Sequence, residues 1–126
     1  MFLGKSNKLE ALVGSDSEFK GDSIIKGTFR IDGKFIGNIS AESVILGEKA
    51  SVKGNITARS VVIGGVVEGN VKADELVEIK HTGQLRGDIF TRMLSVAEGG
   101  VFDGHSNIQK DEAKVIDFPA VEAASK

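Results

Sequence analysis

The chain has 126 residues, with 16 basic and 18 acidic side chains and a net charge of −2 at neutral pH. This length is enough for one domain, and the near balance of charge excludes the strongly basic surface typical of nucleic-acid-binding domains. Cysteine is absent, which excludes disulfides and thiolate metal sites. Sixteen glycines against a single proline predict many tight turns between short elements.

The N-terminal residues 1–18 hold few apolar anchors and are expected to form a flexible tail. No apolar run in the chain approaches the roughly 20 residues that cross a bilayer. The opening has too few apolar residues for a signal peptide, so we expect a cytoplasmic protein. An apolar tip beside two positive charges predicts weak binding to anionic lipid through Met1, Phe2, Leu3, Lys5 and Lys8. An ordinary disordered terminus is the alternative.

A repeat of glycine, a polar residue and an apolar residue runs through residues 19–108. A less regular first unit begins at Gly21. The later units are 17, 15, 18 and 17 residues apart and begin at Gly37, Gly54, Gly69, Gly87 and, in weaker form, Gly104. Alignment of the units places apolar residues in columns, such as Ile39, Ile56, Val71 and Ile89. A repeat of this length indicates a solenoid.

Within each unit the apolar and small residues come as three pairs two positions apart, for example at 39/41, 44/46 and 50/52. A spacing of two is the strand period, so each pair predicts a short strand with one buried face. Three strands and three corners per unit predict an all-β chain, a single parallel β-helix of about six triangular coils over residues 19–108. A helical solenoid is excluded, because each frequent glycine would cost about 1 kcal/mol in a helix interior.

The C-terminal residues 109–126 are charged and alanine-rich, contain the only proline, and are expected to form a second short disordered tail. Within them, residues 115–119 ("VIDFP") are open to two interpretations: a docking segment, or incidental apolar residues in a disordered tail.

No arrangement of catalytic or metal-binding residues emerges from the sequence. His81 and His105 lie at or near predicted corners and are interpreted as surface residues, whereas a closed metal site needs about four ligands with regular spacing. Carboxylates are scattered over outward positions, and no phosphate-binding loop is present. We predict no enzyme activity, no cofactor and no nucleotide or nucleic-acid ligand. A hexapeptide-repeat acyltransferase is the enzyme alternative, but its aliphatic column is lost when the chain is stepped by six from Leu46.

The segment "FRIDGKFIGNI" at residues 29–39, together with the recurring Gly-Asn-apolar and Ala-x-x-Val-x-Ile-Gly pieces, resembles the bactofilins, polymer-forming cytoskeletal proteins of bacteria. The resemblance covers roughly residues 19–108. It implies a right-handed β-helix that polymerises end to end without nucleotide. It further implies filaments on the inner face of the cell membrane that scaffold cell-wall enzymes and serve cell shape. Contacts between like ends, which give a filament without polarity, are also implied.

A solenoid ends in open strand edges and a core that is cut through. Large apolar residues gather near both ends, and we predict a polymerisation interface at Phe19, Phe29, Phe35 and Phe102. Among them, Phe102 is the expected C-terminal anchor. The alternative is that these phenylalanines fill wider coils. A monomeric or small-oligomer binding scaffold is the second functional interpretation, and it would present the outward residues Ile45, Val62 and Val66.

Overall fold

The structure, a computed structural model, describes residues 9–108, which form fifteen β-strands and no helix. The strands are β1 Leu9–Val13, β2 Glu18–Lys20, β3 Ser23–Ile24, β4 Thr28–Ile31, β5 Lys34–Ile36, β6 Ile39–Ser40, β7 Ser43–Leu46, β8 Ser51–Lys53, β9 Ile56–Ile63, β10 Val66–Glu68, β11 Val71–Ile79, β12 Gln84–Arg86, β13 Ile89–Val96, β14 Val101–Asp103 and β15 Ser106–Ile108. The predicted C-terminal tail lies outside the described range, whereas only residues 1–8 of the predicted N-terminal tail do.

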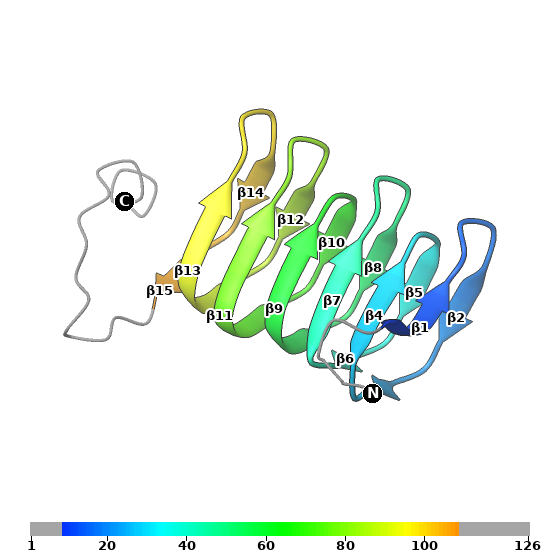
Figure 1. Ribbon diagram of the computed structural model, residues 1–126. Helices are drawn as coiled ribbons and strands as arrows, with labels where there is room; N and C mark the ends of the chain where they lie inside the picture. Colours follow the sequence, from blue (N-terminus) through cyan, green and yellow to red (C-terminus); the bar gives the residue numbers. More distant parts are fainter. Residues whose placement is uncertain (1–8, 109–126) are drawn as a thin grey trace.

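The strands wind into a solenoid whose coils stack along one axis (Figure 1). Three faces of six strands each surround the core. Face 1 holds β1, β4, β7 and the second halves of β9, β11 and β13. Face 2 is the six-stranded sheet β2-β5-β8-β10-β12-β14, and face 3 holds β3, β6, the first halves of β9, β11 and β13, and β15. Every pairing is parallel, so the predicted parallel β-solenoid of about six coils is confirmed.

The long strands turn the corner between faces 3 and 1 without leaving the sheet. In β9 both Ala58 and Val61 are buried. They are three positions apart, whereas side chains on one side of a straight strand recur every two positions. The two residues between them redirect the chain, so that both flanking side chains point into the core. In β11 the same corner contains an irregularity between Ala73 and Leu76.

The register reproduces the apolar columns predicted from the sequence. On face 3 the paired inward residues of four successive coils are Ile39, Ile56, Val71 and Ile89. On face 2 they are Phe35, Val52, Val67 and Leu85. Each of these side chains is at most 2% exposed. The core is therefore a continuous apolar column along the axis of the solenoid.

The Gly-polar-apolar motif builds the corner between faces 2 and 3. Gly54 has a φ of +146°, and a Cβ atom there would lie 1.8 Å from the carbonyl oxygen of Gly37 in the preceding coil. Only glycine lets these corners stack. At the following position the Asn55 N–H donates to Oδ1 of Asn38 over 3.0 Å. Equivalent bonds link successive members of the column Asp22, Asn38, Asn55, Asn70, Asp88 and His105. The motif thereby satisfies one corner N–H in each coil after the first.

The solenoid begins earlier than the sequence suggested. β1 begins at Leu9, ten residues before the expected start at residue 19, and pairs with β4. Its Val13 is 7% exposed and stands in the same inward column as Ile31. The residues before β1 carry no Gly-polar-apolar signature, so the first coil does not align with the later units. Its strand is held by pairing and burial instead.

Candidate assembly surfaces at the two ends of the solenoid

Each end of the solenoid presents three strand edges that have no partner within the described part of the chain. At the N-terminal end these edges belong to β1, β2 and β3, and at the C-terminal end to the second half of β13, to β14 and to β15 (Figure 1). An open edge offers a row of backbone N–H and C=O groups to a further strand. The ends are therefore the places where the folded chain can extend its own sheets.

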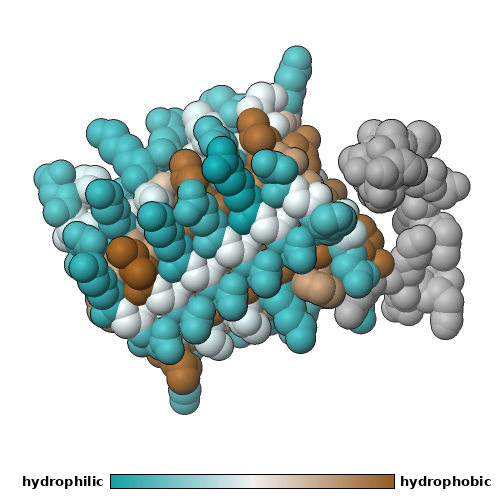
Figure 2. All heavy atoms as spheres, turned by 180° about the vertical axis from the view of Figure 1, so that it is seen from behind, coloured by the Kyte–Doolittle hydropathy of each residue, from teal (hydrophilic) through white to brown (hydrophobic). Residues whose placement is uncertain are grey.

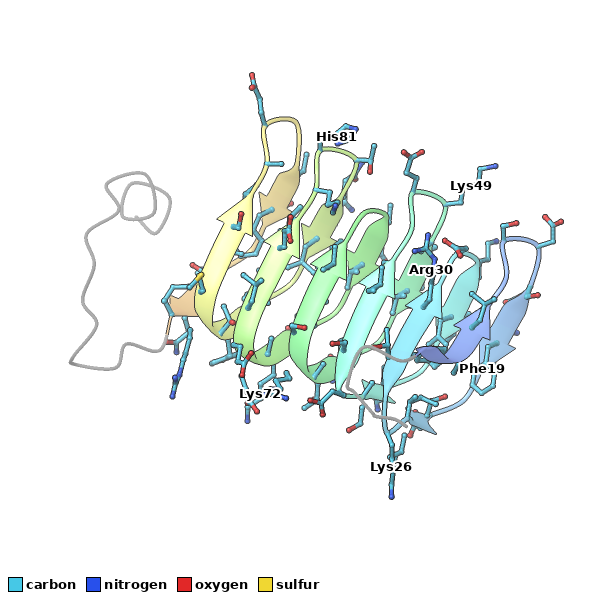
Figure 3. The ribbon with its side chains drawn as sticks, viewed as in Figure 1. Phe19, Lys26, Arg30, Lys49, Lys72 and His81 are labelled. Carbon is cyan, nitrogen blue, oxygen red and sulfur yellow. The ribbon has the colours of Figure 1, made fainter. Side chains whose placement is uncertain are left out.

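Phe19 ends the inward column of face 2 at the N-terminal end (Figure 3). Its ring stacks on Phe35, with the ring centroids 5.0 Å apart. Phe19 is still 41% exposed, because no described coil covers its other side. Removing this remaining aromatic surface from water would favour association with another molecule.

Phe29 and Phe35 are core residues, which corrects their assignment to an exposed end surface. They are 3% and 0% exposed, and their rings meet edge to face with centroids 5.7 Å apart. β1 covers Phe29, whose backbone partner is Ala11, and Phe19 covers Phe35. The prediction of an exposed position was wrong for Phe29 because β1, which covers it, was assigned to the N-terminal tail, and for Phe35 because Phe19 of the preceding coil covers it.

Phe102 ends the same face 2 column at the C-terminal end. It pairs in register with Leu85 and packs half-buried against the core. Face 1 ends in Leu94 and Val96, and Val96 is 44% exposed, whereas its partner Ile79 in the preceding coil is fully buried. Sequence reasoning named Phe102 and missed these two aliphatic residues. The signal that identifies them is their place as the last members of inward columns.

A ladder of charges lies at the corner between faces 3 and 1. Arg59 donates hydrogen bonds to Glu42 in the preceding coil and to Glu75 in the following coil, the latter over 2.9 Å. Hydrogen bonding to Glu75, and then to Glu42, raises the pKa of the Arg59 guanidinium. Because these side chains are largely exposed, the ladder adds little to the stability of the stacked coils.

The described residues offer no arrangement suited to catalysis. Within this part of the chain no three His, Cys, Asp or Glu side chains are grouped to hold a metal ion. His105 is exposed, 3.5 Å from Asp88, and His81 is exposed in a turn (Figure 3). One shallow polar hollow of about 430 Å³ is lined by Ser15, Arg30, Asp32, Glu48 and Lys49. Its arginine is already bound by its aspartate.

Comparison with known proteins identifies the family. The family model described as "Bactofilin: Polymer-forming cytoskeletal" matches residues 11–107. The chain belongs to the bactofilin family. The match begins inside β1, in agreement with the early start of the bactofilin solenoid. In a polymer-forming family, the two open ends of the solenoid are the candidate contact surfaces between copies.

Two curated bactofilins of Myxococcus xanthus (strain DK1622) are similar to this chain. Bactofilin BacO is 32% identical over 100 residues, which cover 77% of this chain and 75% of BacO. Bactofilin BacP is 28% identical over 110 residues, which cover 81% of this chain and 46% of BacP. The chain thus spans less than half the length of BacP.

A solved bactofilin structure has the same fold. It is the cryo-EM reconstruction of Thermus thermophilus bactofilin double helical filaments, with a TM-score of 0.66 and 29% sequence identity. The match covers 76% of this chain and 98% of the Thermus chain. The resemblance to bactofilins seen in the sequence is therefore confirmed, and the chain is a cytoskeletal protein of this family.

Membrane binding was predicted for Met1, Phe2, Leu3, Lys5 and Lys8. These residues lie outside the described part of the chain, so this role stays a prediction. Residues 9–108 contain no helix long and apolar enough to cross a bilayer. The outward residues considered for a binding scaffold are half-buried on faces 1 and 2; they are Ile45, Val62 and Val66.

Proposed function

We propose that this bactofilin polymerises end to end, through the strand edges and cut core at the two ends of its solenoid, into filaments that need no nucleotide. The observation that carries the proposal is the exposure of inward residues at both ends, 41% for Phe19 and 44% for Val96. A second copy with the same coil cross-section is the natural cover for such a surface, and a repeated contact of this kind gives a fibre.

Each end contact would combine two favourable effects. Complete burial of one large apolar side chain contributes about 1.5–3 kcal/mol, and several inward residues are partly exposed at each end. The open edges add backbone hydrogen bonds of about 0.5–1.5 kcal/mol each. Three edges arranged around one core also define a single orientation for the incoming copy, since all three must be paired at once.

Contact between like ends is the arrangement we favour. If β2 pairs antiparallel with β2 of a second copy, Phe19 meets its own equivalent and Glu18 meets Lys20, which gives two opposite-charge pairs across one contact. In a head-to-tail contact β14 would instead pair parallel with β2, and Asp103 would meet Lys20 once. The charge pattern of β2 and the family resemblance both support the first arrangement.

We further propose that the filaments lie on the inner face of the cell membrane and scaffold cell-wall-modifying enzymes, as the family resemblance implies. The support within this chain is the apolar tip Met1, Phe2 and Leu3 next to Lys5 and Lys8. One such tip binds anionic lipid weakly. Many tips on one filament would bind firmly, because every contact after the first is effectively intramolecular.

Electron microscopy of the purified chain tests the proposal. Long filaments are expected without nucleotide, and equally with ATP, GTP or EDTA, because no phosphate or metal site enters the end contacts. A monodisperse monomer or small oligomer would instead support the binding scaffold. Growth that depends on nucleotide would contradict the proposed mechanism.

A further inference from the structure

Face 1 carries far less charge than face 2. Two of its eleven outward strand positions between residues 11 and 108 are charged, and one, Thr28, is buried. The positions are Leu12, Thr28, Arg30, Ser43, Ile45, Ser60, Val62, Leu76, Glu78, Met93 and Ser95. On face 2, seven of twelve are charged: Glu18, Lys20, Lys34, Lys53, Glu68, Arg86 and Asp103. Figure 2 shows how hydrophilic side chains predominate on the side of the molecule away from face 1. A weakly charged sheet surface beside a strongly charged one indicates a contact surface.

The two charges on face 1 are placed symmetrically. One outward column contains, from the first coil to the sixth, Leu12, Arg30, Ile45, Val62, Glu78 and Ser95. Arg30 stands in the second coil and Glu78 in the fifth, at equal distances from the midpoint between Ile45 and Val62. A two-fold axis through this midpoint therefore exchanges the two charged positions.

We propose that face 1 is a lateral contact between two copies of this chain, packed face to face with their solenoids antiparallel, so that Arg30 of each lies opposite Glu78 of the other. The two-fold axis would run along the strand direction. It keeps each outward column opposite itself and reverses the order of the coils. The contact then buries no unpaired charge.

A parallel arrangement of the two solenoids would bury an unpaired charge in the same contact. Its two-fold axis runs along the solenoid and places the two outward columns of each coil opposite one another. Glu78, which makes no ion pair within the described part of the chain, would then lie opposite Leu76. Arg30, already bound to Asp32, would lie opposite Thr28. A charge that is desolvated without a partner is strongly disfavoured. The need of Glu78 for a partner thus selects the antiparallel arrangement.

The two central pairs of positions suit the antiparallel contact. At its centre Ile45 would lie opposite Val62, and in the neighbouring column Ser43 would lie opposite Ser60. Apolar residues of similar size meet in the first pair, and in the second small side chains let the sheets approach to about 10 Å, the usual distance between packed sheets.

The guanidinium of Arg30 is held in place by Asp32 and can still bind a second carboxylate from another chain. Its Nε and Nη2 atoms donate to Asp32 over 3.0 and 3.1 Å, and this hydrogen bonding raises the pKa of the guanidinium. The bonds orient the guanidinium above face 1 (Figure 3) and leave Nη1 for a further acceptor. Glu78 makes no ion pair within the described part of the chain. The two groups therefore complement one another across the proposed contact.

The area of face 1 is too small to hold two free chains together, so the contact depends on polymerisation. Six coils about 4.8 Å apart and four residues of about 3.3 Å each give an area of about 380 Å² per copy. Stable dimers bury about 800 Å² per partner, so two free chains associate weakly through face 1. Along two filaments the same contact recurs and the affinities combine. Lateral association accordingly rests on the proposed end-to-end polymerisation and appears only in the polymer.

A charge-reversal experiment on the full chain tests the contact. Wild-type filaments are expected to associate side by side in electron micrographs. Glu78→Arg and Arg30→Glu should each abolish this association and leave long single filaments, because like charges then face each other. The double variant Arg30→Glu/Glu78→Arg should restore it. Gln84→Arg adds an arginine in the same coil on face 2, next to uncharged partners, and should leave lateral association unchanged.

The readouts separate this inference from the proposed polymerisation. Filament length reports the end contacts, and side-by-side association reports face 1. Long wild-type filaments that remain single would overturn the inference and leave polymerisation intact. Association that survives Glu78→Arg, or that the double variant fails to restore, would also overturn it. Thermal unfolding by circular dichroism confirms that each variant is folded, and a chain that never forms filaments would contradict both proposals.

Discussion

The ring of Phe19 stacks on the ring of Phe35, with centroids 5.0 Å apart and planes 11° from parallel, yet Phe19 is 41% exposed and Phe35 is fully buried. The two residues occupy successive positions of one inward column on face 2. Val52 of the next coil covers the other side of Phe35, whereas no described residue occupies the equivalent position below Phe19. One residue type thus fills the core in one coil and forms a candidate assembly surface in the coil before it.

Alanine substitutions should separate these two roles. Phe35→Ala removes a fully buried ring and is expected to lower the free energy of unfolding by about 3–5 kcal/mol. Phe19→Ala should cost clearly less stability but raise the critical concentration for polymerisation about tenfold, which corresponds to about 1.4 kcal/mol per contact. Thermal denaturation and sedimentation measure the two effects. An unchanged critical concentration for Phe19→Ala would exclude Phe19 from the interface.

Arginine at Phe102 should disperse the polymer without unfolding the chain. Phe102 is half-buried in the last coil, so the new side chain reaches water in the monomer but would be desolvated in an end contact. Leu85→Arg, one coil deeper at a fully buried position, is the control and should unfold the protein. Circular dichroism and light scattering follow both variants. Long filaments of Phe102→Arg would place the C-terminal contact elsewhere.

Reversing the charge of Asp103 should distinguish the two arrangements of the ends. In a head-to-tail filament, Asp103→Lys brings two lysines together, since Lys20 lies opposite, and polymerisation should weaken. Between like ends, Asp103 faces Val101 of the second copy, so the substitution should have little effect. Light scattering at low ionic strength measures the assembly. A strong loss of assembly for Asp103→Lys would contradict the like-to-like arrangement.

The corner glycines should tolerate no side chain. Gly54→Ala places a Cβ atom 1.8 Å from the Gly37 oxygen at a φ of +146°, and is expected to destabilise the fold by at least about 2 kcal/mol. Gly14 has no positive φ, and a Cβ atom there meets only the Ser17 hydroxyl at 3.8 Å. Gly14→Ala should therefore change stability little. Equal melting temperatures for the two variants would refute this explanation of the repeat.

Deletion of residues 2–8 should release filaments from anionic liposomes and leave polymerisation intact. The deletion removes the apolar tip and both lysines, and each basic residue near an anionic surface contributes about 1 kcal/mol. Co-sedimentation with vesicles measures the binding, and filament length in solution is the control. Binding equal to that of the full chain would show that another part of the protein holds the membrane.

The coil and its columns were determined by the sequence alone. Stacked parallel coils place equivalent residues above one another, and burial in the core favours apolar or small residues at the inward positions. The match of Ile39 with Ile56 could therefore be read directly from the spacing, and the structure pairs the same residues. The Gly54-Asn55 corner is equally local, because its backbone φ and its N–H ladder recur in each unit. These motifs also carried the resemblance to bactofilins.

Only the tertiary structure decided where the columns end and what covers them. Burial of Phe29 depends on the strand that contains Ala11, which pairs with it from eighteen positions away and carries no repeat signature. The shared outward column of Arg30 and Glu78 depends on corner lengths that differ from coil to coil. Exposure at the ends and the pattern of a face are properties of neighbouring coils, because each is set by what stacks above and below. A residue's local sequence cannot encode them.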